Sequence, residues 1–185
     1  MPISVPENKQ AASLGAGIGL LLAIMTGLAL AQAPQPGRHS SLTPARDLAG
    51  EAKGAAAQGK AYVVLFSETG CPWCERARQE FLLPMQADAQ LGGKAVFRQV
   101  NIDSDEVLRD FNGRTSSHRR FAQAEGVRMY PTVALYTPEG KPAADRLTGF
   151  TNAVYYGSSI ERRIDAALAG IAAAQPRNPP PPARK

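Results

Sequence analysis

Cysteine is scarce in this chain: Cys71 and Cys74 are the only two among 185 residues. Two thiols separated by two residues cannot join distant parts of a fold, and alone they cannot supply the four ligands of a closed structural zinc site. An inert disulfide of this spacing would close a very short loop, which stabilises a fold only slightly. The scarcity leaves redox cycling or a two-thiolate Cu(I) site as uses of the pair.

Histidine is nearly as rare. His39 and His118 are the only two, and neither is spaced from the cysteines as a catalytic base would be. Covalent haem attachment is excluded, because Glu75 follows Cys74 where that motif requires histidine.

An excess of positive charge is missing from the middle of the chain. The formal net charge is +5, but Arg177, Arg184 and Lys185 supply three of these charges and residues 1–31 supply none. The basic balance is therefore a property of the C-terminal end, and it gives no reason to expect a nucleic-acid partner.

Charged residues are absent from residues 11–31, and Leu, Ile, Ala and Gly dominate 14–30. The stretch ends in Ala-Leu-Ala at 29–31, a small-x-small pattern of the kind that signal peptidase cleaves. Residues 1–31 are thus predicted to be a signal peptide, or alternatively an uncleaved anchor, since about 20 apolar residues can span a bilayer. Both interpretations place the rest of the chain in the periplasm or another extracytoplasmic compartment, where disulfide chemistry is permitted.

Composition divides the remainder into three parts. Residues 32–43, rich in Pro, Gly and Ser, are predicted to be a tether, and residues 44–174 a globular domain. Residues 175–185 contain five prolines and are predicted to be a disordered tail.

Within the domain, apolar β-branched runs predict strands, and they fall at 61–66, 95–102, 129–136 and 146–149. Helical patterns fall at 44–58, 75–90 and 158–174, with one or two short helices within 103–126. Thr43 is the expected N-cap of the first helix and Gly59 its stop, and Pro84 is expected to kink the second helix. This order predicts an α/β fold with a central mixed sheet of about four strands, flanked by helices on both faces.

Six short motifs in this order resemble the thioredoxin superfamily over residues 44–172. They are Val-Val-Leu-Phe at 63–66, Gly-Cys-Pro-Trp-Cys at 70–74, Val-Asn-Ile-Asp at 100–103, Tyr-Pro-Thr at 130–132, Glu-Gly-Lys at 139–141 and Leu-Thr-Gly-Phe at 147–150. Within the superfamily the chain resembles exported single-domain members, such as the SoxW-type and related periplasmic thioredoxin-like proteins. The resemblance implies a thioredoxin fold and a cis peptide bond before Pro131, with Tyr130 and Pro131 contacting the substrate.

Two positions depart from the classical pattern of that superfamily. Leu65 stands where classical members carry a buried aspartate, and Pro72-Trp73 replaces Gly-Pro between the cysteines. Glu68 is a candidate proton relay in place of the missing aspartate, with a solvated loop carboxylate as the alternative. The indole of Trp73 is a candidate substrate contact, with an ordinary surface cap as the alternative.

The position of the pair between a strand and a helix suggests its chemistry. Helix N-termini favour thiolate over thiol, and in Cys-x-x-Cys motifs the pKa of the first cysteine falls from about 8.5 to between about 3.5 and 7.5. Cys71 is therefore expected to attack and Cys74 to resolve the mixed disulfide.

The leading hypothesis is an extracytoplasmic thiol:disulfide oxidoreductase that acts on protein disulfides. It is expected to be a monomer and to need no bound cofactor or metal. A membrane redox partner is expected to recharge the pair, and relatives of this type suggest a reductase. A disulfide oxidase or isomerase, and a copper-binding metallochaperone that uses the same two thiolates, are the alternatives.

Overall fold

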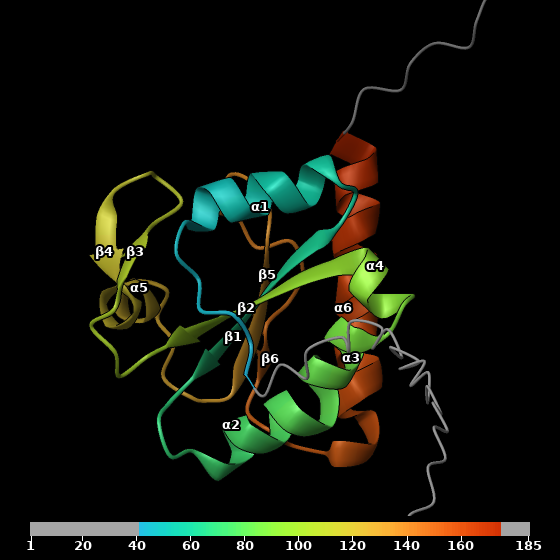
Figure 1. Cartoon of the computed structure of the whole chain (residues 1–185). Helices are drawn as coiled ribbons and strands as arrows, with labels where there is room; N and C mark the ends of the chain where they lie inside the picture. The colour runs from blue at the N-terminus through green and yellow to red at the C-terminus, as the bar shows by residue number, and fades with distance from the viewer. Residues whose placement is uncertain (1–40, 175–185) are drawn as a thin grey trace, which may run out of the picture. The chain divides into compact units, whose positions relative to one another are not determined.

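Four strands form the central sheet of the computed structural model, which describes residues 41–174 (Figure 1). They are β1 (Ala61–Ser67), β2 (Ala95–Asn101), β5 (Thr132–Tyr136) and β6 (Leu147–Thr148), in the order β2-β1-β5-β6. β1 and β2 are parallel, whereas β5 runs antiparallel to both β1 and β6. The mixed sheet predicted from the sequence is confirmed, with its first and third predicted strands at the centre.

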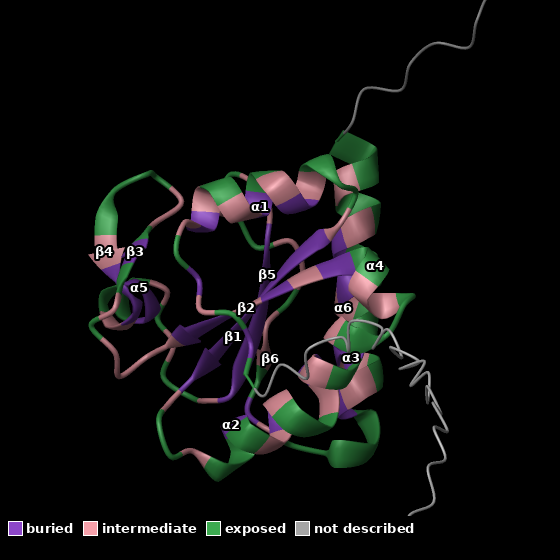
Figure 2. Ribbon diagram, in the orientation of Figure 1, coloured by how far each residue is buried: buried purple, intermediate pink, exposed green. Residues whose placement is uncertain are grey.

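Helices cover both faces of this sheet. They are α1 (Leu48–Ala57), α2 (Pro72–Arg76), the π-helix η1 (Ala77–Leu82), α3 (Leu83–Ala87), α4 (Leu91–Lys94), α5 (His118–Ala124) and α6 (Ala153–Ala174). Alternate residues of β1 enter two separate cores. Val63 and Leu65 pack with η1 and α6, whereas Val64 and Phe66 pack with α1 and α5. β1 is consequently buried along its whole length, as Figure 2 shows.

The first helix begins later than its sequence pattern predicts. Thr43 accepts a hydrogen bond from the amide of Gln99 through its carbonyl (3.0 Å), and Ala45 donates to the Gln99 carbonyl (2.9 Å). This segment is therefore extended along β2 and cannot be helical. Asp47 is the N-cap instead of Thr43, because its carboxylate accepts from the amide of Gly50. Gly59, with a φ of +67°, follows the helix as predicted.

The second predicted helix is continuous but changes its geometry before Pro84. The π-helical segment η1 carries the chain from α2 to α3, and the amide of Leu83 bonds to the carbonyl of Arg78, five residues earlier. Proline has no amide hydrogen, and its ring clashes with the carbonyl four residues before it. A wider turn at this place relieves that clash, so the expected kink takes the form of a π-helix.

The prediction for 103–126 was wrong in its first half. β3 (Val107–Arg109) and β4 (Thr115–Ser117) form a separate two-stranded antiparallel sheet in place of a helix, and only α5 is helical. The Asp110 carboxylate explains the hairpin, since it accepts from the amides of Asn112 and Arg114 (both 2.9 Å). Such a turn offers the backbone a local alternative to a helix.

The C-terminal elements differ from the prediction mainly in their bounds. β5 starts at Thr132 rather than 129, and α6 starts at Ala153 rather than 158. Ile160 and Ile164 are fully buried, and Tyr156 and Ala167 complete the buried face. The predicted signal or anchor segment, most of the tether and the tail lie outside the described residues. Within residues 41–174 no helix is both long and apolar enough to cross a membrane.

Candidate active site

Cys71 and Cys74 form a disulfide at the start of α2, where the carboxyl end of β1 leads into the helix. Their Cα atoms are 5.3 Å apart. Cys71 is the N-cap, and its sulfur accepts a hydrogen bond from the amide of Cys74 (3.1 Å). Pro72 occupies the first turn, where its missing amide hydrogen costs no helical bond. Cys71 is partly exposed, whereas Cys74 is completely buried.

Strand pairing brings the Tyr130-Pro131 segment to the same end of the sheet. Phe66 near the end of β1 is paired with Thr132 at the start of β5, so the residues that follow β1 lie beside those that precede β5. The peptide bond between Tyr130 and Pro131 is cis, as the resemblance implies. Tyr130 is partly exposed, but Pro131 itself is buried.

The loop between β1 and Cys71 is held from two sides. The side chains of Glu68 and Tyr130 interact, and this interaction, followed by burial, raises the pKa of Tyr130. On the other side, the amide of Thr69 donates to the Asp103 carboxylate (3.2 Å). The Thr69 side chain is the main cause that holds the pKa of Asp103 below its ordinary value. The structure thus joins two residues predicted separately, Glu68 and Tyr130.

The Trp73 side chain lies beside the pair on the exposed side of α2. Its ring stacks on Phe150, with centroids 5.7 Å apart and planes inclined by 22°. The Arg76 guanidinium lies over both rings, 5.5 Å from the Trp73 centroid and 4.9 Å from that of Phe150. More than half of Trp73 (53%) nevertheless remains exposed.

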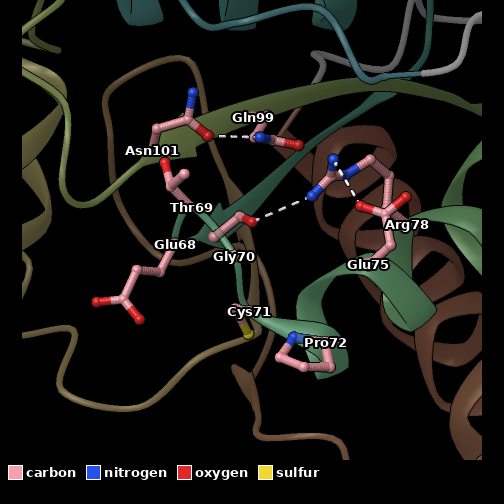
Figure 3. Close-up of a pocket in the computed structure, with 10 residues that line it drawn as sticks. Glu68, Thr69, Gly70, Cys71, Pro72, Glu75, Arg78, Gln99 and Asn101 are labelled. Carbon is pink, nitrogen blue, oxygen red and sulfur yellow. Dashed lines mark hydrogen bonds and ion pairs between the residues drawn. The ribbon is translucent and has the colours of Figure 1, made fainter.

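Cys71 also lines a polar cleft of about 450 Å³ (Figure 3). Arg78 contributes its guanidinium, which pairs with Glu75 (3.0 Å) and contacts the Ser67 hydroxyl (3.4 Å). Gln99 and Asn101 contribute amide side chains from the end of β2, and Gln99 donates to Asn101.

The cleft residues Arg78, Gln99 and Asn101 were not predicted from the sequence. Asn101 is paired with Ser67 in the parallel register of β1 and β2, so it lies next to the cysteine loop. A parallel arrangement of these two strands was the signal that could have located it. No group of three or more His, Cys, Asp or Glu side chains suited to a metal occurs in residues 41–174.

Comparison with known proteins agrees with this architecture. The family described as a thioredoxin-like domain matches residues 48–161. The chain belongs to the thioredoxin-like domain family. No curated protein sequence matches it.

Solved structures similar to this thioredoxin-like domain include three thioredoxins. Oxidised mitochondrial thioredoxin 3 from Saccharomyces cerevisiae is 18% identical, with a TM-score of 0.45 over 67% of this chain and 93% of its own. Thioredoxin from Malassezia sympodialis is 19% identical, with a TM-score of 0.42 over 70% and 98%. Thioredoxin NaTrxh from Nicotiana alata is 20% identical, with a TM-score of 0.43 over 67% and 94%.

The thioredoxin-like domain and its Cys71–Cys74 disulfide establish the type of chemistry. The protein is a thiol:disulfide oxidoreductase whose substrates are protein thiols and disulfides. Its fold is the thioredoxin fold, with the mixed four-stranded sheet and flanking helices described above.

Proposed function

We propose that the protein is an extracytoplasmic reductase of protein disulfides, in which Cys71 is the attacking and Cys74 the resolving thiol. The observation that carries these roles is the contrast between the two sulfurs. Cys71 caps the helix at a partly exposed position, whereas Cys74 is completely buried one turn further on. A macromolecular substrate can reach the first cysteine and not the second.

The exchange balances without a further reagent once the pair is reduced. The Cys71 thiolate attacks one sulfur of the substrate disulfide, and the substrate thiolate that leaves takes up a proton. Cys74 then loses its proton and attacks the Cys71 sulfur, which restores the intramolecular disulfide and releases the second substrate thiol. Two electrons and two protons pass to the substrate.

The charges around Cys71 support the reductive direction. The charged side chains that line its cleft are two carboxylates, Glu68 and Glu75, and one guanidinium, Arg78. Their net negative charge opposes a thiolate on Cys71. A reduced form that is stabilised less donates its electrons more readily, whereas strongly oxidising relatives owe their potential to a stabilised reduced form.

The export segment predicted at residues 1–31 supports a periplasmic or other extracytoplasmic location, and a SoxW-type role. A single pair that reduces substrates outside the cytoplasm has to be re-reduced there, so we propose a membrane electron donor. We further propose that the protein acts as a monomer. Trp73 and Tyr130 are the proposed substrate-contacting residues, whereas Pro131, expected from the sequence to contact the substrate, is buried and is proposed to act through its neighbour Tyr130.

Trapping experiments test the roles of the cysteines. The Cys74→Ala variant should accumulate a mixed disulfide between Cys71 and its substrate, and Cys71→Ala should form none. Both variants should lose insulin reduction, whereas Lys53→Ala on the exposed side of α1, which leaves the site intact, should retain it. Insulin reduction that survives Cys71→Ala would contradict the proposed nucleophile.

Two further measurements test direction and the copper alternative. The redox potential, measured against glutathione buffers, should lie near that of reducing thioredoxins, about −270 mV, and not near that of strong oxidants, about −120 mV. A pair found oxidised in intact cells after acid quenching and thiol alkylation would favour an oxidase. Stoichiometric Cu(I) binding by the reduced protein without disulfide turnover would favour a metallochaperone.

A further inference from the structure

The Arg76 guanidinium lies against two aromatic rings beside the redox pair, and the disulfide chemistry does not explain its role. Trp73 is the only tryptophan of the chain. Its neighbours Phe150 and Arg76 form a compact triangle with it, since the three pairwise separations are 5.7, 5.5 and 4.9 Å. A cation within about 6 Å of a ring centroid is attracted by the ring quadrupole.

Arg76 is itself fixed in place. Its Nε and Nη2 atoms donate to the two carboxylate oxygens of Glu80, one helical turn further on, at 2.8 and 3.1 Å. This two-point bond restricts the plane of the guanidinium, which then rests on Trp73 and Phe150 with a defined orientation. The pair with Glu80 also raises the pKa of Arg76.

Phe150 is anchored to the body of the domain. Its ring lies 4.6 Å from that of buried Tyr156 and 5.9 Å from that of Phe81. The amide of Gly149 donates to the carbonyl of Pro131 (2.8 Å), so the chain just before Phe150 is tied to the cis-proline segment. The base on which Trp73 rests is therefore rigid, although Trp73 itself is exposed.

We propose that Arg76 is a positioning residue for substrate binding. It holds the Trp73 indole against Phe150, so that the exposed part of the indole forms a fixed apolar surface next to Cys71. The occupant that fits this surface is an apolar or aromatic side chain close to the target disulfide. The proposal rests on exchange with protein disulfides and is independent of the direction of electron flow.

A different role for Arg76 would be to stabilise the Cys71 thiolate by its charge. The geometry favours positioning, because the guanidinium is already engaged by Glu80 and covers two rings. The two roles differ in what they predict. A charge effect changes the reactivity of Cys71 toward every disulfide, whereas positioning affects only substrates large enough to touch Trp73.

The test compares insulin with hydroxyethyl disulfide, a substrate too small to use the indole. Arg76→Ala should raise KM for insulin about three-fold with kcat unchanged, as expected for loss of one exposed cation–π contact. The rate with hydroxyethyl disulfide and the alkylation rate of Cys71 should stay constant. Arg76→Lys, which keeps the cation, should recover part of the loss, and Arg162→Ala on α6 is the matched surface control.

Two further measurements use the Trp73→Ala variant and the fluorescence of Trp73. Arg76→Ala should add nothing to Trp73→Ala, and in the presence of Trp73 it should lower the fluorescence anisotropy of that single indole. Equal losses with both substrates, a changed alkylation rate, or additive effects of the two substitutions would overturn the proposal. If the wild-type protein lacked exchange activity, the proposed function would fail, while unchanged anisotropy in Arg76→Ala would separately refute positioning.

Discussion

Two residues from different loops, Glu68 and Tyr130, interact next to the redox pair, and Glu68 raises the pKa of Tyr130. The carboxylate that the sequence suggested as a proton relay is thus near a tyrosine hydroxyl. Its contribution is more simply that of a tie, which holds the loop before Cys71 against the loop before β5. Substrate binding is then the property that should depend on it.

Removal of either end of this tie should have the same effect. Glu68→Ala and Tyr130→Phe should each raise KM for a protein disulfide about three-fold, because each removes one side of the contact between the two loops. The double variant should resemble the single variants, because the second change removes a contact that is already lost. Steady-state insulin reduction over a range of pH measures this.

The proton-relay role predicts a different pattern. In that case Glu68→Ala alone would lower kcat and change its pH dependence, and Tyr130→Phe would leave both unaltered. That result would show that the tie is incidental to the reaction.

At this scale the sequence reveals residues whose chemistry is local. Cys71 and Cys74 are neighbours in the chain, so their use could be predicted before any fold was known. Gln99 and Asn101 approach the cysteine loop only through the parallel pairing of β1 and β2. No pattern within their own strand indicates that contact, which explains why they were missed.

Among the elements, α1 provides a direct test of the structure against the sequence pattern. Both Thr43 and Asp47 are residue types that cap helices, but only the Asp47 carboxylate accepts from a first-turn amide. Asp47→Ala should therefore lower the free energy of unfolding by about 1 kcal/mol. Thr43→Ala should change it little, because Thr43 bonds to Gln99 through its backbone. Urea denaturation of the two variants measures the difference.

Equal destabilisation by both substitutions, or a larger effect of Thr43→Ala, would place the start of the helix where the composition suggested. Asp47→Asn is the useful control, since asparagine caps helices about as well as aspartate. It should retain most of the wild-type stability.

Strong local signals account for the elements that were predicted well. The continuous apolar run of β1 is typical of a strand that is buried on both faces. The β3–β4 hairpin was missed because three-residue strands carry almost no periodicity, and the turn at Asp110 depends on side-chain bonds to the backbone. A kink was predicted where the structure has a π-helix, because a proline indicates that a helix is disturbed but does not indicate which geometry the helix adopts there.

For the molecule as a whole, the two cores share one chemical property. Tyr62 and Tyr136 are buried on the α1 side of the sheet and Tyr156 on the α6 side. Burial is the main cause that raises the pKa of all three. These three tyrosines therefore contribute fully to the free energy of unfolding below about pH 10, the pKa of tyrosine in the unfolded chain. Their contribution is lost as the pH rises above that value.

Tyr156 offers the cleanest measurement of this effect, because its buried hydroxyl has no hydrogen-bond partner among the described residues. Between pH 9 and pH 11, urea denaturation should show a loss of stability that is smaller by about 1.4 kcal/mol in Tyr156→Phe than in the wild type. At pH 7 the substitution should be neutral or stabilising, since it removes an unpaired buried hydroxyl.

Tyr155, the exposed neighbour on the same helix, is the matched control. Tyr155→Phe should leave the alkaline loss of stability unchanged. An equal effect of both substitutions would mean that the Tyr156 hydroxyl is not isolated from water.

The extended segment before α1 also affects how the edges of the sheet can interact with other protein chains. It pairs with the outer side of β2 at Gln99, while the opposite border of the sheet is β6, which is only two residues long. Open strand edges are templates on which other chains can add strands and aggregate. A thiol:disulfide oxidoreductase that acts on proteins meets other chains at its surface during each exchange. The pairing at Gln99 and the short β6 shorten the free edges on which such a chain could add a strand.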